Sequence, residues 1–332
     1  MKRSTILTIA LILCLAALGA CAWLMFGSSV SGFTYADADK YTAGDTVVSG
    51  PVENLYIDWT EGRVNVEYYD GDGITVSETA DRPLSEDNRL RWWLDGTTLH
   101  VRYAKSGFRI SFNLEKKLTV SLPEGTVLKS ADIGSTSGDL NIPYLAADEI
   151  RLDSTSGDIR AVTAAAKLTV SATSGDTDVR QESGIDTVTL ASTSGSIACA
   201  LGSAKQVTAD SSSGGIRLAL SAGAESIRLH STAGNIDLDA AAADKADISS
   251  TSGSISARLA AAGSLKIGST SGCVDAYLPA EPGFTCTVDT ASGSFSSDLA
   301  LTKNGNTYTC GDGSAVCGIS TTSGDIRLHK AE

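Results

Sequence analysis

The middle of the chain lacks aromatic residues and proline. No Phe, Trp or Tyr lies between Tyr144 and Tyr277, and no proline lies between Pro143 and Pro279. Of the 19 aromatic residues, 14 precede residue 126, including all four Trp. A core built from large rings is therefore excluded over this stretch. The sequence divides into an aromatic first third and a long remainder rich in Gly, Ser, Thr and Ala.

Positive charge is also scarce. The chain has 26 Lys and Arg against 39 Asp and Glu, a net charge of −13. Without the two N-terminal basic residues, Lys2 and Arg3, the net charge is −13 − 2 = −15. Nucleic-acid binding depends on clustered basic side chains, so we expect no nucleic-acid partner.

Spacings typical of metal or catalytic sites are missing as well. The cysteines outside the N-terminal apolar run are Cys199, Cys273, Cys286, Cys310 and Cys317. They form no CxxC motif, and the three His, at positions 100, 230 and 329, are scattered. We expect no metal site, no cofactor and no catalytic residue. Cys199 fits a small core residue, and Cys310 and Cys317, which flank "GDGSAV", are candidates for a local disulfide.

One long hydrophobic run stands at the N-terminus. Lys2 and Arg3 precede 21 mostly apolar residues from Ile6 to Phe26, about the length that a helix needs to cross a bilayer. The flanking charges place the start inside the cell and the rest outside. We expect residues 1–30 to be an uncleaved single-pass anchor and residues 31–44 to be a linker. Two alternatives stay open: "LGAC" resembles a lipobox with Cys21 as the lipidation site, and the run also fits a cleaved signal peptide.

A short motif, written "STSGD" at residues 135–139, recurs along the rest of the chain. Its glycines are spaced by 18–21 residues, except for a final interval of 31. Such self-similarity at a nearly constant period is the sequence mark of a solenoid. The ten glycines are Gly138, Gly157, Gly175, Gly195, Gly214, Gly234, Gly253, Gly272, Gly293 and Gly324.

Apolar and polar residues alternate on both sides of each glycine. Val188 and Leu190 precede Gly195, for example, and Ile197 and Cys199 follow it. Alternation with period two indicates strands with one buried face. We predict an all-β fold, a parallel β-solenoid (β-helix-like) of about ten 19-residue coils. The expected core includes Leu152, Ile159, Leu190, Ile197, Leu229, Ile236, Ile248 and Ile255.

A string of antiparallel hairpins is the alternative fold. The motif lacks the Asn-Gly type of turn that tight hairpins favour, which argues against it.

The motif itself fits a structural corner. Glycine adopts backbone angles that other residues avoid, and Ser, Thr and Asp bond to nearby backbone groups in turns. Asp139, Asp158 and Asp176 follow the glycine in three consecutive units and would stack into a carboxylate ladder. Turn capping is the favoured interpretation. A Ca²⁺ site is the alternative, because Ca²⁺ binds oxygen ligands.

The two ends of the repeat differ from its middle. Residues 45–125 contain looser strands and predict an N-terminal β cap, because a solenoid must cover its open end. Residues 126–332 form the predicted solenoid. The interval of 31 predicts a hairpin insertion near 299–316, where Asn304-Gly305 lies between β-prone segments.

Three segments together carry a family resemblance. The order "NLYIDWTEGRVNVEYYDGDGITVSE", "KKLTVSLPEG" and serial "STSGD" units resembles the toastrack family, a bacterial adhesin-like domain of unknown function. The resemblance covers about residues 50–330. It implies an all-β stack on an envelope protein that is often membrane-anchored, with some members linked to envelope stress responses. It supplies no catalytic residues.

These observations predict a non-enzymatic protein of the bacterial cell membrane with an extracytoplasmic C-terminal domain. We expect an adhesin-like interaction module or an envelope-sensing module, whose partner is an unknown envelope protein or glycan. A self-associating structural protein is the first alternative, and a polysaccharide-acting enzyme on a β-helix is the second.

The cap, including its "YAKSGFRISF" segment with Phe108, Arg109 and Phe112, is the expected partner surface, because Trp, Tyr and Arg dominate binding energy in interfaces. We expect Trp59 to fill the cap core. Strand alternation sends Trp92 and Trp93 to opposite faces, so one of the two is expected in the core and the other outside.

Overall fold

The computed structural model describes residues 34–107, 114–281 and 283–331. The chain divides into two compact units, Met1–Asp39 with Ser106–Phe112, and Lys40–Lys105 with Asn113–Glu332. In the first unit, the amide of Tyr35 donates to Ser106 Oγ at 3.2 Å. The expected membrane anchor and Cys21 lie outside the described residues. Within the described ranges, no helix has the length and apolarity to span a bilayer.

Among the residues that the structure describes, nearly all regular structure is β, apart from two short 3₁₀ helices at Ala38–Lys40 and Glu86–Asn88. The strands before the repeat are β1 (Thr42–Ala43), β2 (Thr46–Val48), β3 (Asn54–Tyr69), β4 (Ile74–Ala80), β5 (Arg91–Asp95), β6 (Thr98–Arg102) and β7 (Lys116–Pro123). The repeat contains β8 (Leu128–Ser154), β9 (Ile159–Ala172), β10 (Thr177–Gln181), β11 (Ile185–Ser192), β12 (Ile197–Ser211), β13 (Ile216–Ser231), β14 (Ile236–Ala240), β15 (Ala243–Ser250), β16 (Ile255–Leu259), β17 (Ala262–Ser269) and β18 (Val274–Leu278). The last strands are β19 (Gly283–Ser292), β20 (Phe295–Ser297), β21 (Thr302–Asn304), β22 (Thr307–Gly311), β23 (Ala315–Ser323) and β24 (Ile326–Lys330).

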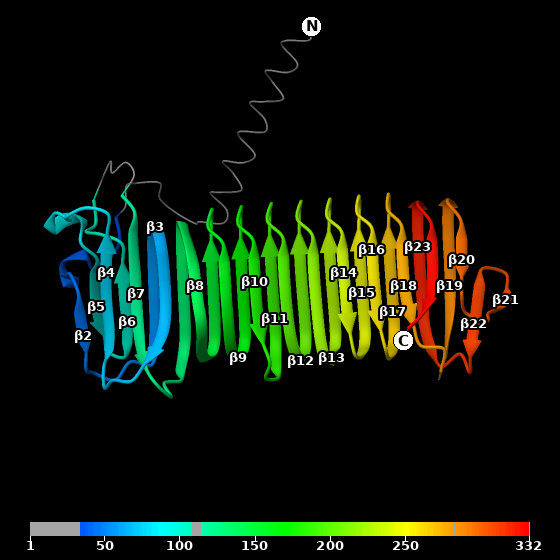
Figure 1. Cartoon of the computed structure of the whole chain (residues 1–332), viewed down its shortest axis with the longest axis horizontal. Coiled ribbons are helices and arrows are strands. Elements are labelled where there is room, and N and C mark those ends of the chain that lie inside the picture. The colour runs from blue at the N-terminus through cyan, green and yellow to red at the C-terminus, as the bar shows by residue number, and fades with distance from the viewer. Residues whose placement is uncertain (1–33, 108–113, 282, 332) are drawn as a thin grey trace, which may run out of the picture. The chain divides into compact units, whose positions relative to one another are not determined.

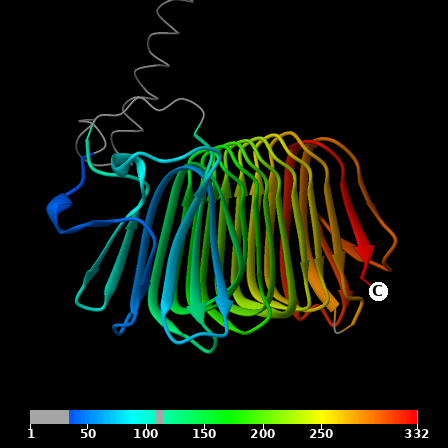
Figure 2. The ribbon, with the colours of Figure 1, turned by 60° about the vertical axis from the view of Figure 1, so that its left-hand side comes forward.

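In the larger unit, strands from successive coils pair in parallel and in register. Ile197 of β12, for example, pairs with Thr177 of β10 on one side and with Ile216 of β13 on the other. The result is two facing ladders joined at corners, and several long strands run through a corner from one ladder to the other (Figures 1 and 2). The solenoid prediction is confirmed, and the alternative of serial hairpins is wrong.

The first ladder runs β1–β5–β6–β3–β8–β9–β11–β12–β13–β15–β17–β23–β19–β22–β21. The second ladder runs β2–β4–β7–β3–β8–β9–β10–β12–β13–β14–β16–β18–β24–β20. Here β3, β8, β9, β12 and β13 each contribute one half to each ladder.

The core lies between the two ladders. All eight residues predicted for it are at most 1% exposed. Their polar neighbours along each strand point outward, as the alternation requires. Each coil therefore buries a few aliphatic side chains against its neighbours, and the stack gains one continuous core.

The C-terminal coils do not follow chain order. The last strands of the chain, β23 and β24, lie between the coil of β17 and β18 and the coil of β19 and β20. Figure 1 shows β23 inserted next to β19. The long glycine interval arises because the chain first builds the outer coil, then the β21–β22 hairpin, and then returns inward. The hairpin turns at Asn304-Gly305, where Gly305 has φ 61°.

Candidate functional site

The repeat glycines form one column along a corner of the stack. A Cβ on Gly195 would lie 1.9 Å from the carbonyl oxygen of Gly175, and each of the other nine would meet the carbonyl oxygen of a glycine in the adjacent coil at 1.9–2.4 Å. None of the ten has a positive φ. The expectation that these corners need unusual backbone angles is wrong. Glycine is required because a carbonyl group occupies the place of its side chain.

Serine and aspartate complete the corner. Ser192 Oγ accepts the amide of Gly195 at 2.9 Å and donates to the Gly195 carbonyl oxygen at 2.7 Å. Asp158 Oδ1 accepts the amide of Asp176 in the next coil at 3.0 Å. Asp139 and Asp176 make the same bond to the coil that follows each of them. These carboxylates therefore cap turns, and among the described residues no group of three or more His, Cys, Asp or Glu could hold a metal ion.

The cysteines do not pair as expected. Cys310 and Cys317 are not bonded to each other, because Cys310 lies on β22, Cys317 lies on β23, and β19 runs between these two strands. The local disulfide predicted from the sequence is therefore wrong. Cys199 is 3% exposed, and burial raises its pKa to about 12, as suits a small core residue.

The cap contains a fully buried charge. Lys116 Nζ lies 2.6 Å from Glu78 Oε2 and donates to the carbonyl oxygens of Tyr103 and Asn88 at 2.6 and 2.8 Å. The rings of Trp59 and Tyr103 flank the ammonium at 4.9 and 4.2 Å. Trp59 is fully buried, as predicted. A buried charge with this many partners holds strands together, and removing a partner would be costly. We assign the cluster a structural role.

An aromatic row crosses the outer face of the first ladder at the cap. Trp93 of β5 pairs with His100 of β6, and His100 pairs with Tyr56 of β3. The Trp93 and His100 rings stack with centroids 5.4 Å apart, and Tyr56 lies 5.4 Å from His100. Tyr41 packs edge-on against Trp93 at 5.6 Å, and the Arg102 guanidinium lies 4.9 Å from the Tyr56 ring. We name these five residues the cap patch.

The two neighbouring tryptophans separate as strand alternation predicts. Trp92 pairs with the buried Val101 and packs against the core. Trp93 joins the cap patch outside it, where it is half-buried. The prediction of opposite faces is confirmed. The sequence analysis did not single out Tyr56 or His100. Tyr56 stands two residues before Asp58, and His100 stands two residues before Arg102, so the two side chains of each pair point to the same face of the ladder.

Charged side chains border the patch. Arg102 forms an ion pair with Asp58 on the adjacent strand. Burial, together with the charge of Arg102, lowers the pKa of His100 and so favours the neutral form of this ring. Burial raises the pKa of Asp132, which follows Tyr56 in the same row, against the opposing effect of Arg151. The patch therefore combines a neutral aromatic row with mixed charges. Phe108, Arg109 and Phe112, which belong to the expected surface, lie outside the described residues.

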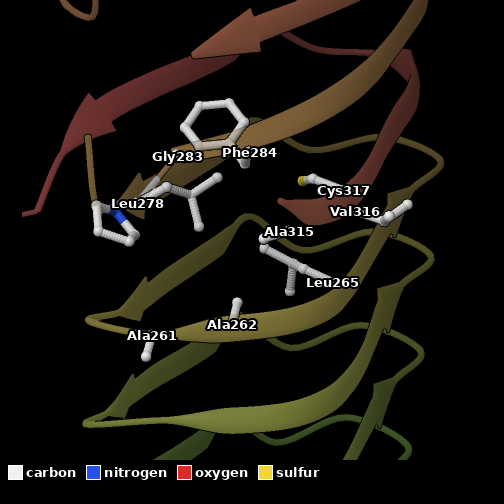
Figure 3. A pocket seen from close by; sticks show the side chains of 10 residues that line it. Ala261, Ala262, Leu265, Leu278, Gly283, Phe284, Ala315, Val316 and Cys317 are labelled. Atoms are coloured by element: carbon white, nitrogen blue, oxygen red, sulfur yellow. The ribbon is translucent and has the colours of Figure 1, made fainter. Parts of the chain in front are cut away.

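A small apolar cavity of about 70 Å³ lies at the other end of the stack. Figure 3 shows Leu265, Phe284 and Cys317 in its wall. Ala315 also lines it, at the start of β23. Strand β23 begins the coil that is inserted between β17 and β19, and the chain enters it directly from β22. The cavity has too little room for a drug-sized ligand.

A family model described as Toastrack DUF4097 matches residues 52–260 and 162–329. The chain belongs to this family. No curated protein matches this toastrack chain.

Solved structures are similar to this toastrack protein at low identity. A "putative adhesin" from Bacteroides fragilis NCTC 9343 has 15% identity and a TM-score of 0.34, covering 87% of this chain and 97% of its own. A "putative adhesin" from Parabacteroides merdae ATCC 43184 has 13% identity and a TM-score of 0.46, covering 87% and 96%. A "putative lipid binding protein" from Parabacteroides distasonis ATCC 8503 has 15% identity and a TM-score of 0.43, covering 87% and 96%. All three scores are below 0.5, so family membership rests on the family model.

Proposed function

We propose that this toastrack protein is a non-enzymatic interaction module, anchored in the bacterial cell membrane by residues 1–30, that binds an envelope protein or glycan through its cap patch. The observation that carries the proposal is the outward row of Tyr41, Trp93, His100 and Tyr56 with Arg102 beside it. Trp, Tyr and Arg are the residues over-represented among binding hot spots. An aromatic row also offers flat apolar area with polar edges, which suits either kind of partner.

Two features favour this proposal over its alternatives. Asp139 and Asp158, two of the three aspartates stacked along the corner, already accept backbone amides. End-to-end assembly is disfavoured because both ladders end in strands of two or three residues, β1 and β21 in the first and β2 and β20 in the second. Very short terminal strands offer little edge to another chain.

The experiment compares Trp93→Ala with Tyr277→Ala in the full chain, using isolated cell envelopes of the native host as the probe. Tyr277 is also outward-facing and half-buried, but it lies on β18, far along the stack. We expect Trp93→Ala to weaken binding more than tenfold, as for a hot spot worth about 2 kcal/mol. Tyr277→Ala should bind like the wild type.

Thermal melting of both variants checks that they fold. Unchanged binding by Trp93→Ala, or equal losses in the two variants, would remove the cap patch as the site. A turnover assay on acidic polysaccharides addresses the enzyme alternative, and we expect no product.

A further inference from the structure

Two cysteines face each other at the C-terminal end of the stack. Cys286 of β19 pairs in register with Cys317 of β23, and the two strands run parallel. Paired residues on neighbouring strands are about 4.8 Å apart, which lies within the range of Cα separations that a disulfide spans, about 4.4–6.8 Å. Both side chains point into the core, since Cys286 is 0% exposed and Cys317 is 4% exposed.

The two thiols are neighbours across the ladder. Cys286 Sγ donates to the Thr287 carbonyl oxygen at 3.8 Å, and the nearby Cys286 thiol, together with burial, raises the pKa of the Cys317 thiol. No other described cysteine has a cysteine as its ladder partner. Cys310 pairs with Phe284 and directs its sulfur to the Ala280 carbonyl oxygen at 3.8 Å, and Cys199 pairs with Val179 and Leu218 in the middle of the stack.

The neighbouring cavity gives the pair room to move. Typical disulfides place their Cβ atoms about 3.5–4.5 Å apart, slightly closer than the ladder spacing. The Cys317 side chain forms part of the cavity wall, next to Leu265 and Phe284 (Figure 3). Strand β23 can therefore shift by a few tenths of an ångström without a clash on that side.

We propose that Cys286 and Cys317 form a disulfide that ties the inserted coil to the terminal coil. The oxidant is a low-molecular-weight disulfide or the disulfide of an exported oxidoreductase. One thiolate attacks this disulfide and releases one thiol of the oxidant, and the second thiolate then attacks the mixed disulfide and releases the other. The protein loses two protons and two electrons in total, and the oxidant gains them as it becomes two thiols.

The bond has a structural consequence at this end of the stack. It closes a loop that contains the β21–β22 hairpin, so the inserted coil of β23 and β24 can no longer leave its place between two earlier coils. In the cell, the bond depends on the export assumed in the proposed function, because cytosolic thiols would keep the pair reduced. Buried thiols with a raised pKa react slowly. The bond therefore forms during folding, before β23 closes against β19.

The test is refolding in vitro, which does not depend on where the protein resides. The full chain is reduced and unfolded, then refolded in detergent with a mixture of oxidised and reduced glutathione. Thiols are counted with a maleimide in denaturant, before and after reduction. We expect the wild type to gain two thiols on reduction, with no glutathione added to its mass. Cys286→Ser and Cys317→Ser should each gain at most one, as a mixed disulfide with glutathione.

Two matched variants sharpen the result. Cys310→Ser removes the other cysteine of the predicted local pair, and Cys199→Ser removes a buried cysteine far along the stack; both should still gain two thiols. The proposal is overturned if the wild type gains none, if Cys286→Ser still gains two, or if Cys310→Ser loses the gain. Cys317→Ser should still bind isolated envelopes through the cap patch, so failure of this proposal and failure of the proposed function are separate outcomes.

If a serine variant does not fold, a second measurement uses the wild type alone. The oxidised wild type should melt several degrees lower after a reductant is added, since a disulfide restricts the unfolded chain. An unchanged melting temperature for a protein shown to carry the bond would overturn the structural consequence.

Discussion

At the scale of single residues, the repeat depends on an absent side chain. Each motif glycine sits under the carbonyl group of a glycine in the adjacent coil, and the column runs from Gly138 to Gly293. Any Cβ there would separate two coils whose strands are otherwise held about 4.8 Å apart. The column therefore requires glycine at every coil of the stack, which accounts for the constancy of the motif in sequence.

Gly195→Ala tests this requirement. The new Cβ would lie 1.9 Å from the Gly175 carbonyl oxygen, so the two coils must separate locally. We expect a loss of at least 1–3 kcal/mol in the free energy of unfolding, roughly the cost of overpacking, measured by denaturant unfolding. The matched control is Gly318→Ala on β23, where a Cβ meets nothing within 4 Å and stability should be nearly unchanged. Equal effects of the two variants would contradict the role of the column.

Asp158 distinguishes turn capping from a metal ladder. Asp158→Asn keeps an oxygen that can accept the Asp176 amide, as Asn235 already does for the Ser254 amide at 2.9 Å. We expect Asp158→Asn to melt close to the wild type and Asp158→Ala to lose about 1 kcal/mol, the typical value of one hydrogen bond. Melting should be the same with Ca²⁺ and with a chelator. A large Ca²⁺-dependent rise that Asp158→Asn abolishes would instead support a metal ladder.

Residue-scale prediction succeeded where the cause is local. Alternation of apolar and polar residues identified the core, including Leu190 and Ile197, because side-chain direction follows from neighbours along one strand. It could not give the reason for the glycines, which depends on a carbonyl group in another coil. It also could not bring Tyr56 next to His100, since that pairing joins strands 44 residues apart in the chain.

At the scale of elements, the C-terminal end of the stack departs most from the regular repeat. The Asn304-Gly305 turn predicts a hairpin from local chemistry alone. Insertion of β23 and β24 between two earlier coils leaves no local signal, because their sequence repeats the same strand–corner–strand pattern as every other coil. The erroneous pairing of Cys310 with Cys317 has the same origin. The two residues are close in sequence, but the outer strand β19 runs between them.

The β21–β22 hairpin covers the outer edge of β19. Replacing Thr302–Gly311 with a Gly/Ser linker of equal length would remove the hairpin strands and leave the outer edge of β19 unpaired, while its inner edge stays paired with β23. An unpaired strand of this length is a template for another chain. We expect the variant to form oligomers with rising concentration, measured by light scattering, while the wild type keeps one mass. A variant that stays at the wild-type mass would show that the hairpin does not protect this edge.

At the scale of the larger unit, the cap and the repeats carry different chemistry. The coils are built from small side chains and the glycine column, and they differ little from one another. The cap holds Trp59, the buried Lys116 and the cap patch. A stack of nearly equivalent coils can lose some of them without changing its ends, because each coil contacts mainly its neighbours. The length of the stack and the recognition of a partner are therefore separable properties of this protein.

Deletion of residues 196–234 tests that separation. It removes two coils and joins Gly195 to Asn235, so that Asn235 takes the place of Ser196 and the glycine column continues from Gly195 to Gly253. The stack should shorten by about 10 Å, two strand spacings. It should melt somewhat earlier, because two coil interfaces are lost. Binding to isolated cell envelopes should equal that of the wild type, since the cap patch is unchanged. Loss of binding in a shortened protein that still melts cooperatively would place the recognition surface on the repeats, where Trp93→Ala should then have no effect.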